Sequence, residues 1–163
     1  MPARFLYARF VSGTQKAAVD WNHTVDEFAR VYAGAAPERT VERVAMTPGP
    51  AVTWRLVSEN RREIARACRL FTAEQHVRAD IARLLRGIGA LQVHTAPAPR
   101  LRSTGWFVTH EGALVMMGSR RYEKRSAAEQ AAALAVRAIT EIATTGMPGP
   151  DPAADSTGTV LSA

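Results

Sequence analysis

Cysteine and lysine are almost absent from this sequence, which has one cysteine, Cys68, and two lysines among 163 residues. A single cysteine excludes an internal disulfide, so we expect a reducing, cytoplasmic compartment. No apolar run approaches the ~18 residues that a membrane-spanning helix needs. The first residues also show no long apolar stretch before a cleavage site, so we expect neither a secretory signal nor contact with a membrane.

The sequence also lacks the short motifs that mark common catalytic sites. It has no P-loop, no nucleophile elbow and no glycine-rich dinucleotide motif. Its histidines, His23, His76, His94 and His110, form no i,i+4 pair and lie at no metal-ligand spacing from Cys68. Arginines flank Cys68 and would lower its pKa, but a buried structural thiol is the favoured interpretation. We therefore predict a non-enzymatic protein with no catalytic residue, metal or cofactor.

Arginine is the abundant charged residue. The chain has 19 arginines and a net charge of +6, and residues 51–125 alone hold 14 basic and 6 acidic side chains. Residues 145–163 are rich in proline, glycine, alanine and serine without periodicity, which predicts a disordered tail. The basic excess is therefore concentrated in the central part of the chain.

Two stretches of that central part share one pattern, which indicates an internal repeat. Each opens with a tryptophan and an aliphatic residue two places on, which point to the same face of a strand. A turn containing Asn or Gly follows, and then a second strand that ends on a large aromatic residue. The corresponding pairs are Trp54 and Trp106, Leu56 and Val108, Asn60 and Gly112, and Phe71 and Tyr122.

Each stretch then continues as a predicted helix, so the pattern indicates two ββα units at residues 49–89 and 104–144. Thr72 with Gln75, and Ser126 with Glu129, fit the capping box that opens a helix. A single long helix over residues 58–85 is the alternative for the first unit, because its residues are good helix formers. Apolar side chains follow at helical spacing, namely Val77, Ile81, Leu84, Leu85 and Ile88 in the first helix and Leu134, Ala138, Ile139 and Ile142 in the second.

The remaining segments flank and connect these units. Residues 1–48 are predicted to add a strand at residues 5–11, which alternate weakly, and a helix opened by a third capping box, Thr24 with Glu27. Residues 40–46 are a further strand candidate. The proline-rich residues 90–103 predict a stiff linker between the two units.

The repeated pattern resembles the YegP-like family, short bacterial domains of unknown function that often occur in tandem. The first unit departs from the family in having two arginines where a glycine and a polar residue are usual at the turn. The resemblance covers about residues 52–142 and implies a fold, but it implies no activity and no catalytic residues. It depends on Trp54, Arg55, Leu56, Asn60, Ile64, Phe71 and Ile81 in the first unit and on Trp106, Phe107, Val108, Gly112, Ser119, Tyr122 and residues 126–129 (SAAE) in the second.

We therefore expect an α+β protein in which the two units place four strands in one mainly antiparallel sheet, with both of their helices on one face. The N-terminal strand and helix would extend or cover this sheet. A sheet with one free face would stack on a second sheet, so a homodimer is one hypothesis for the partner.

The favoured functional hypothesis is a protein-interaction or regulatory module with an unidentified protein partner. The alternative is a basic protein that binds nucleic acid through phosphate backbones. The basic segment before the second helix resembles the helix start of double-stranded-RNA-binding domains, but the other elements of those domains are missing. The candidate nucleic-acid-binding residues are Arg61, Arg62, Arg66 and Arg69 in the first unit and Arg120, Arg121, Lys124 and Arg125 in the second.

Overall fold

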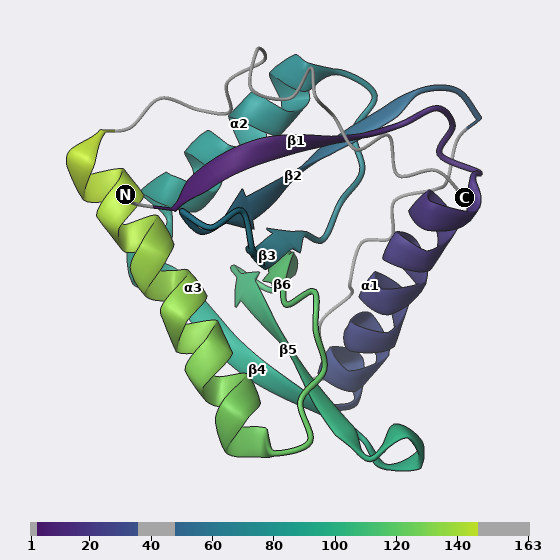
Figure 1. The fold of residues 1–163 in the computed structure, drawn as a ribbon, viewed down its shortest axis with the longest axis vertical. Coiled ribbons are helices and arrows are strands. Elements are labelled where there is room, and N and C mark those ends of the chain that lie inside the picture. Colours follow the sequence, from purple (N-terminus) through teal and green to yellow (C-terminus); the bar gives the residue numbers. More distant parts are fainter. Residues whose placement is uncertain (1–2, 36–47, 147–163) are drawn as a thin grey trace.

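The computed structural model describes residues 3–35 and 48–146, which fold into one antiparallel sheet with helices packed on it (Figure 1). Six strands lie in the order β1-β2-β3-β6-β5-β4, so the α+β class is confirmed. Beyond the four strands predicted from the two units, β1 extends the sheet at one edge and β4 is an additional strand at the other. In chain order the elements are β1 (Arg4–Phe10), α1 (Lys16–Ala35), β2 (Ala51–Val57), β3 (Glu63–Ala67), α2 (Glu74–Arg86), the short 3-10 helix η1 (Ile88–Ala90), β4 (Leu91–Ala98), the 3-10 helix η2 (Pro99–Leu101), β5 (Ser103–His110), β6 (Ala113–Met117) and α3 (Arg125–Thr145).

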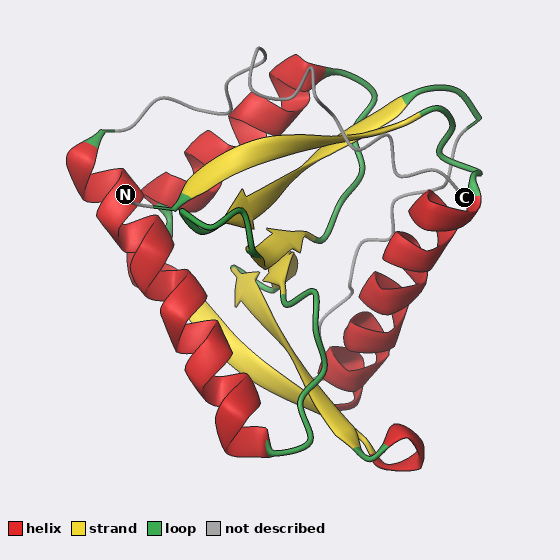
Figure 2. Cartoon of the chain, viewed as in Figure 1, coloured by secondary structure: helices red, strands yellow, loops and turns green. Residues whose placement is uncertain are grey.

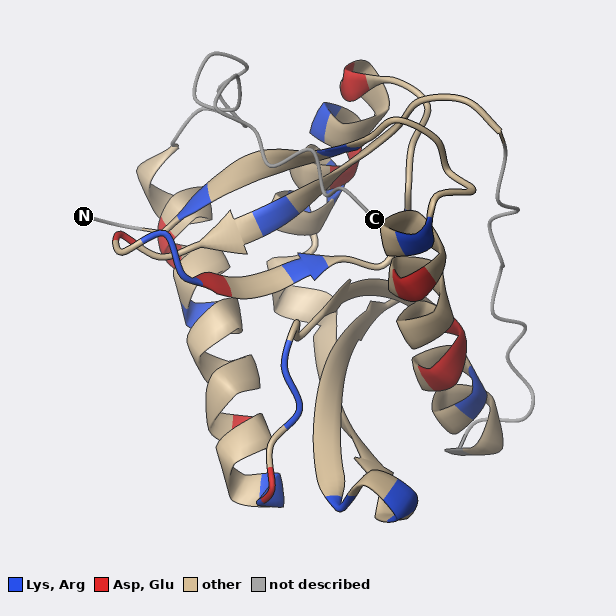
Figure 3. Cartoon of the chain, turned by 45° about the vertical axis from the view of Figure 1, so that its right-hand side comes forward, with Lys and Arg blue, Asp and Glu red and all other residues tan. Residues whose placement is uncertain are grey.

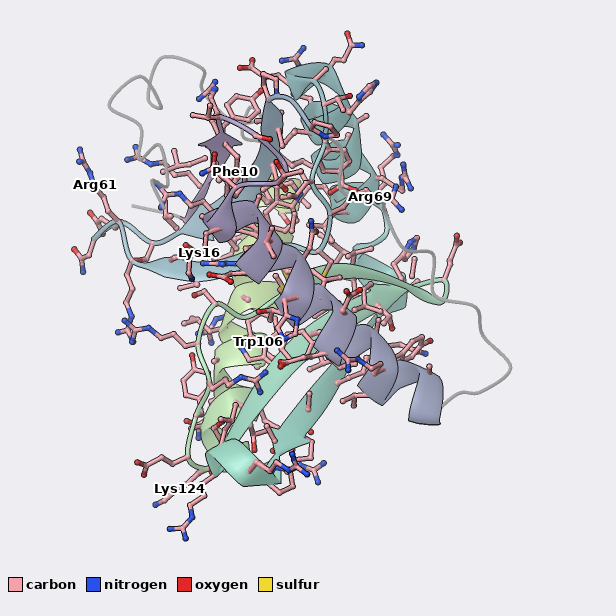
Figure 4. The ribbon with its side chains drawn as sticks, turned by 90° about the vertical axis from the view of Figure 1, so that its right-hand side faces the viewer. Phe10, Lys16, Arg61, Arg69, Trp106 and Lys124 are labelled. Atoms are coloured by element: carbon pink, nitrogen blue, oxygen red, sulfur yellow. The ribbon has the colours of Figure 1, made fainter. Side chains whose placement is uncertain are left out.

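Helices cover both faces of the sheet (Figure 2). α2 and α3 pack on one face, over a core that includes Trp54, Trp106 and Met116. α1 packs on the other face, where Trp21 and Phe28 belong to a second core. In Figure 4, α1 lies in front of the sheet and α3 behind it. The helices of the two predicted units share one face, as expected, but α1 occupies the face that was expected to be free for a second sheet.

The two halves of the sheet meet at a short seam between β3 and β6. The residue pairs along this seam are Arg66 with Met117 and Ala67 with Met116, whereas β1 with β2 and β4 with β5 pair along their whole length. α3 lies across the seam and contacts β3, β4, β5 and α2. Packing of α3 therefore joins the two halves in addition to the short strand pairing.

Alanine residues form the inner face of α3. Ala128, Ala132 and Ala135 are fully buried, and their small side chains let the helix backbone approach the sheet closely. Ile139 is buried on the same face, as predicted. Leu134, which was predicted to be buried, is 44% exposed because alanines occupy the inner face instead.

Residues 90–103 do not form the predicted linker. Most of this segment is β4, which pairs with β5 along its full length and is followed by η2. β4 is the last strand of the sheet, and Pro97 is tolerated there because an edge strand needs hydrogen-bond donors on one side only. The proline-rich composition that predicted a linker therefore belongs to an edge strand and the turn that follows it.

The predicted capping boxes do not open the helices. α2 begins at Glu74 and α3 at Arg125, both without a side-chain cap, and Thr24 lies inside α1. Each of the two later helices starts shortly after an isolated β-bridge, at Phe71 or at Tyr122. These bridges hold the chain to the sheet and fix the point at which the helix starts.

Other sequence predictions have mixed outcomes. β3 occupies Glu63–Ala67, so the alternative of one long helix over residues 58–85 is wrong. The predicted N-terminal strand is present as β1, which lies at one edge of the sheet, and α1 follows it. The strand candidate at residues 40–46 and nearly all of the predicted tail lie outside the described residues.

Trp54 and Trp106 are both fully buried beneath the helices, but their indole N–H groups differ. Trp54 Nε1 donates to Asp80 Oδ2 of α2 at 2.8 Å. Trp106 Nε1 is buried without a hydrogen-bond partner in the described part of the chain. Ala131 holds in α3 the place that Asp80 holds in α2, counted from the first residue of each helix. Burial raises the pKa of Asp80, and the hydrogen bond from Trp54 opposes that shift.

Replacing each tryptophan by phenylalanine separates the loss of volume from the loss of this hydrogen bond. We expect Trp54→Phe to lower the free energy of unfolding by about 1–3 kcal/mol more than Trp106→Phe, because only the first change removes a hydrogen-bond donor from the half-buried Asp80 carboxyl. Urea unfolding of the two variants measures the difference. Equal losses would show that the hydrogen bond to Asp80 adds nothing to stability.

Candidate functional site

β4 is held at the edge of the sheet by contacts on its α1 side. His94 stacks on Phe107 of β5, with ring centroids 4.9 Å apart, and meets Tyr32 of α1 edge-on at 5.1 Å. Its Nε2 lies 2.8 Å from Thr109 Oγ1. Burial lowers the pKa of His94 below its ordinary value of 6.5, so the ring is neutral at pH 7. These contacts fix the edge strand on the face of the sheet that α1 covers.

The opposite side of β4 borders a groove beneath α3. The groove has a volume of about 620 Å³ and is lined by Val93 of β4 and by Ala133 and Val136 of α3. Val93 is 45% exposed. Because β4 pairs only with β5 among the described strands, backbone hydrogen-bonding groups along its outer side are available beside the groove. The other lining residues are Glu129, Arg137, Thr140 and Glu141.

Charged residues of alternating sign follow the α3 wall of this groove. Arg125, Glu129, Arg137 and Glu141 lie at four-residue intervals around a central Ala133, and all of them except Arg125 line the groove. Within the helix, Arg125 Nε donates to Glu129 Oε1 at 2.8 Å. We call these five residues the α3 charge row. It presents both signs of charge around a small residue.

The eight predicted nucleic-acid-binding residues do not come together in one stripe. Figure 4 shows Arg61 on the β2–β3 turn, Lys124 before α3, and Arg69 far from both. Figure 3 shows basic residues spread over strands, helices and turns. Arg61, Arg62, Arg120 and Lys124 are exposed. The structure therefore places the two predicted clusters apart.

Several of these predicted residues have partners within the fold. Arg66 Nε donates to Glu63 Oε1 at 2.5 Å, and its guanidinium lies over an aromatic ring of α1. Arg121 of the β6–α3 connection donates to Glu27 of α1, beside a small hollow of about 230 Å³. Arg125 belongs to the α3 charge row. Arg66 and Arg121 therefore join elements of the fold, whereas Arg125 pairs within its own helix.

Cys68 is a buried thiol, as predicted. Its side chain is buried, and burial together with the nearby charge of Asp80 raises its pKa far above the ordinary value, so the thiol stays protonated. Residues 3–35 and 48–146 contain no group of three side chains that could hold a metal ion. None of the helices in these two ranges has the length and apolar character needed to cross a membrane.

Comparisons of the chain with protein families, curated proteins and solved structures found no match. The groove is therefore interpreted from its own residues. Two signals for it are present in the sequence: the four-residue spacing of charges in α3, and the alternation of Leu91 and Val93 with polar residues in β4. The linker interpretation of residues 90–103 hid the second signal.

We expect acid to destabilise the fold through His94. Because its pKa in the folded state lies below 6.5, the unfolded chain binds the proton more readily, and stability present above that pH is lost as the pH falls toward the folded value. His94→Gln should flatten this loss between roughly pH 7 and 5. His76→Gln, at an exposed position on α2, should leave it unchanged. Urea unfolding across this pH range is the measurement, and an unaltered slope in His94→Gln would contradict the assignment.

We expect binding to duplex DNA or RNA to be weak and to depend only modestly on salt, because the separated basic side chains neutralise few phosphates. The double variants Arg61→Ala/Arg62→Ala and Arg120→Ala/Lys124→Ala should each reduce the affinity without abolishing it. Fluorescence anisotropy at two salt concentrations measures this. Complete loss in one double variant alone would instead define a local nucleic-acid site.

Proposed function

We propose that this protein is a non-enzymatic protein-interaction module that accepts an extended segment of a partner along the outer side of β4, under α3. The observation that carries the proposal is the groove of about 620 Å³ beside an edge strand. An added strand would form backbone hydrogen bonds with β4 and place alternate side chains in the groove.

Three features of the groove support this proposal. His94 and its aromatic neighbours already hold β4 in place, so a partner need not order the strand and binding costs less entropy. Val93 and Val136 offer apolar contact, and Ala133 leaves room for a side chain. The α3 charge row supplies selectivity, because charges at the rim of an interface discriminate among partners.

We also propose that residues 49–144 contain two related units of the YegP-like kind. Two observations support the relation. Isolated bridges join Val52 to Phe71 and Thr104 to Tyr122, in the same relation to their strands and helices. In addition, the register shifts near the end of the strand in both hairpins, after Leu56 in β2 and after Val108 in β5.

In the described part of the first half, side chains occupy the border between the edge strand and its helix. There β1 and α2 hold the places of β4 and α3. Arg9 of β1 pairs with Glu74 of α2 at 2.6 Å, and Arg78 of α2 donates to the Tyr7 hydroxyl at 3.3 Å. Long side chains thus occupy this border, which supports the β4 edge as the docking side.

A random peptide library displayed on phage and selected on the full chain tests the proposal. We expect selected peptides to shift the NMR amide signals of β4 and to bind Val93→Arg at least about tenfold more weakly, because the new charge fills the apolar part of the groove. The matched control is Val11→Arg, which changes a valine that is 71% exposed outside the groove.

Two results would contradict the proposal. One is a set of selected peptides that bind Val93→Arg and the unchanged chain equally well. The other is a set of amide shifts confined to elements other than β4 and α3. Unfolding curves of both valine variants establish that each is folded, since both positions are solvent-exposed and are expected to tolerate substitution.

A further inference from the structure

We infer that the segment accepted at this edge is β4 of a second copy, so that two chains associate about a twofold axis passing beside Val93 and Ala133. Their sheets then join edge to edge through the two β4 strands. The inference rests on the proposed function, because it uses the same edge and the same groove. It goes beyond that proposal in naming the partner.

The α3 charge row is complementary to itself about Ala133. A twofold axis at this residue makes the two copies of α3 run antiparallel, so residues equally far from Ala133 face each other. Glu129 then faces Arg137 of the second copy, and Arg137 faces Glu129 of the second copy. The same operation opposes Arg125 and Glu141. Each pair across the axis combines opposite charges.

A twofold axis at another residue of the α3 charge row does not pair opposite charges in this way. An axis one turn further along, at Arg137, would place two copies of Arg137 against each other and would leave Glu129 without a basic partner in the row. An axis at Glu129 would oppose two copies of Glu129 in the same way. Like charges across an interface weaken association and select against the arrangement. The order of charges therefore favours one alignment of two identical chains.

The strand edge agrees with this axis. Val93 is the β4 residue that lines the groove together with Ala133, so the axis that aligns the helices also centres the strand pair on Val93. The two Val93 side chains then lie opposite each other on the α3 side of the joined sheet. Leu91 pairs with Thr95 of the second copy. Pro97, which lacks an N–H, falls beyond these central pairs.

Sedimentation equilibrium of the full chain tests the inference through charge reversal. We expect a reversible monomer–dimer equilibrium whose dissociation constant rises at least about tenfold in Glu129→Arg and in Arg137→Glu, because each variant opposes like charges. The double variant Glu129→Arg/Arg137→Glu should dimerise again. An equimolar mixture of the two single variants should form a heterodimer, since arginines on one chain then face glutamates on the other.

The matched control is Arg86→Glu, a charge reversal at an exposed position on α2, which should leave the dissociation constant unchanged. Thermal unfolding confirms that every variant is folded. A chain that stays monomeric over the accessible concentration range overturns the inference, as does a dimer that the reversals in α3 leave intact. Peptide binding that Val93→Arg weakens would still support the proposed function in either case, so failure of the two claims is distinguishable.

Discussion

The position of α3 across the β3–β6 seam is the constraint on which the rest of the structure depends. So few residue pairs join the two halves of the sheet that strand hydrogen bonds alone would leave them weakly connected. α3 contacts strands on both sides of the seam and also contacts α2. Its buried alanines bring it close to the sheet, over Trp54 and Trp106, so burial of one continuous apolar core supplies the cohesion that the seam lacks.

The same constraint produces the candidate site. The face of α3 that packs on the sheet covers the seam and β5. The side of the helix next to β4 is therefore less closely packed, and a groove lies there. On the other half, the shorter helix α2 is tied to the edge strand by the pair Arg9–Glu74. The two halves of the sheet therefore differ at their edges. One edge is occupied by side chains of its own helix, and the other offers both an apolar surface and backbone groups.

Periodicity in the sequence was sufficient to predict the hairpins and helices that surround the tryptophans, because burial imposes a regular spacing on apolar residues. Gly112 adopts the positive φ expected at its turn, but in the first hairpin Arg61 rather than Asn60 does so. β4 was missed although Leu91 and Val93 alternate with polar residues, because the prolines of this segment indicate a linker unless its position at the edge of the sheet is known. Helix starts were also missed, because strand bridges at Phe71 and Tyr122 fix them in place of local caps.

Charge was informative only when its spacing was considered together with the fold. The excess of arginine in residues 51–125 predicted a basic surface, yet Arg66 and Arg121 are engaged with Glu63 and Glu27. A net charge does not distinguish a side chain that joins two elements from one that meets a ligand. The order of charges along one helix face does separate these two roles, once the edge strand beside the helix is known. A row that is complementary to itself has a physical reason to occur where two identical helices meet, whereas stabilising a single helix requires only pairs within that helix.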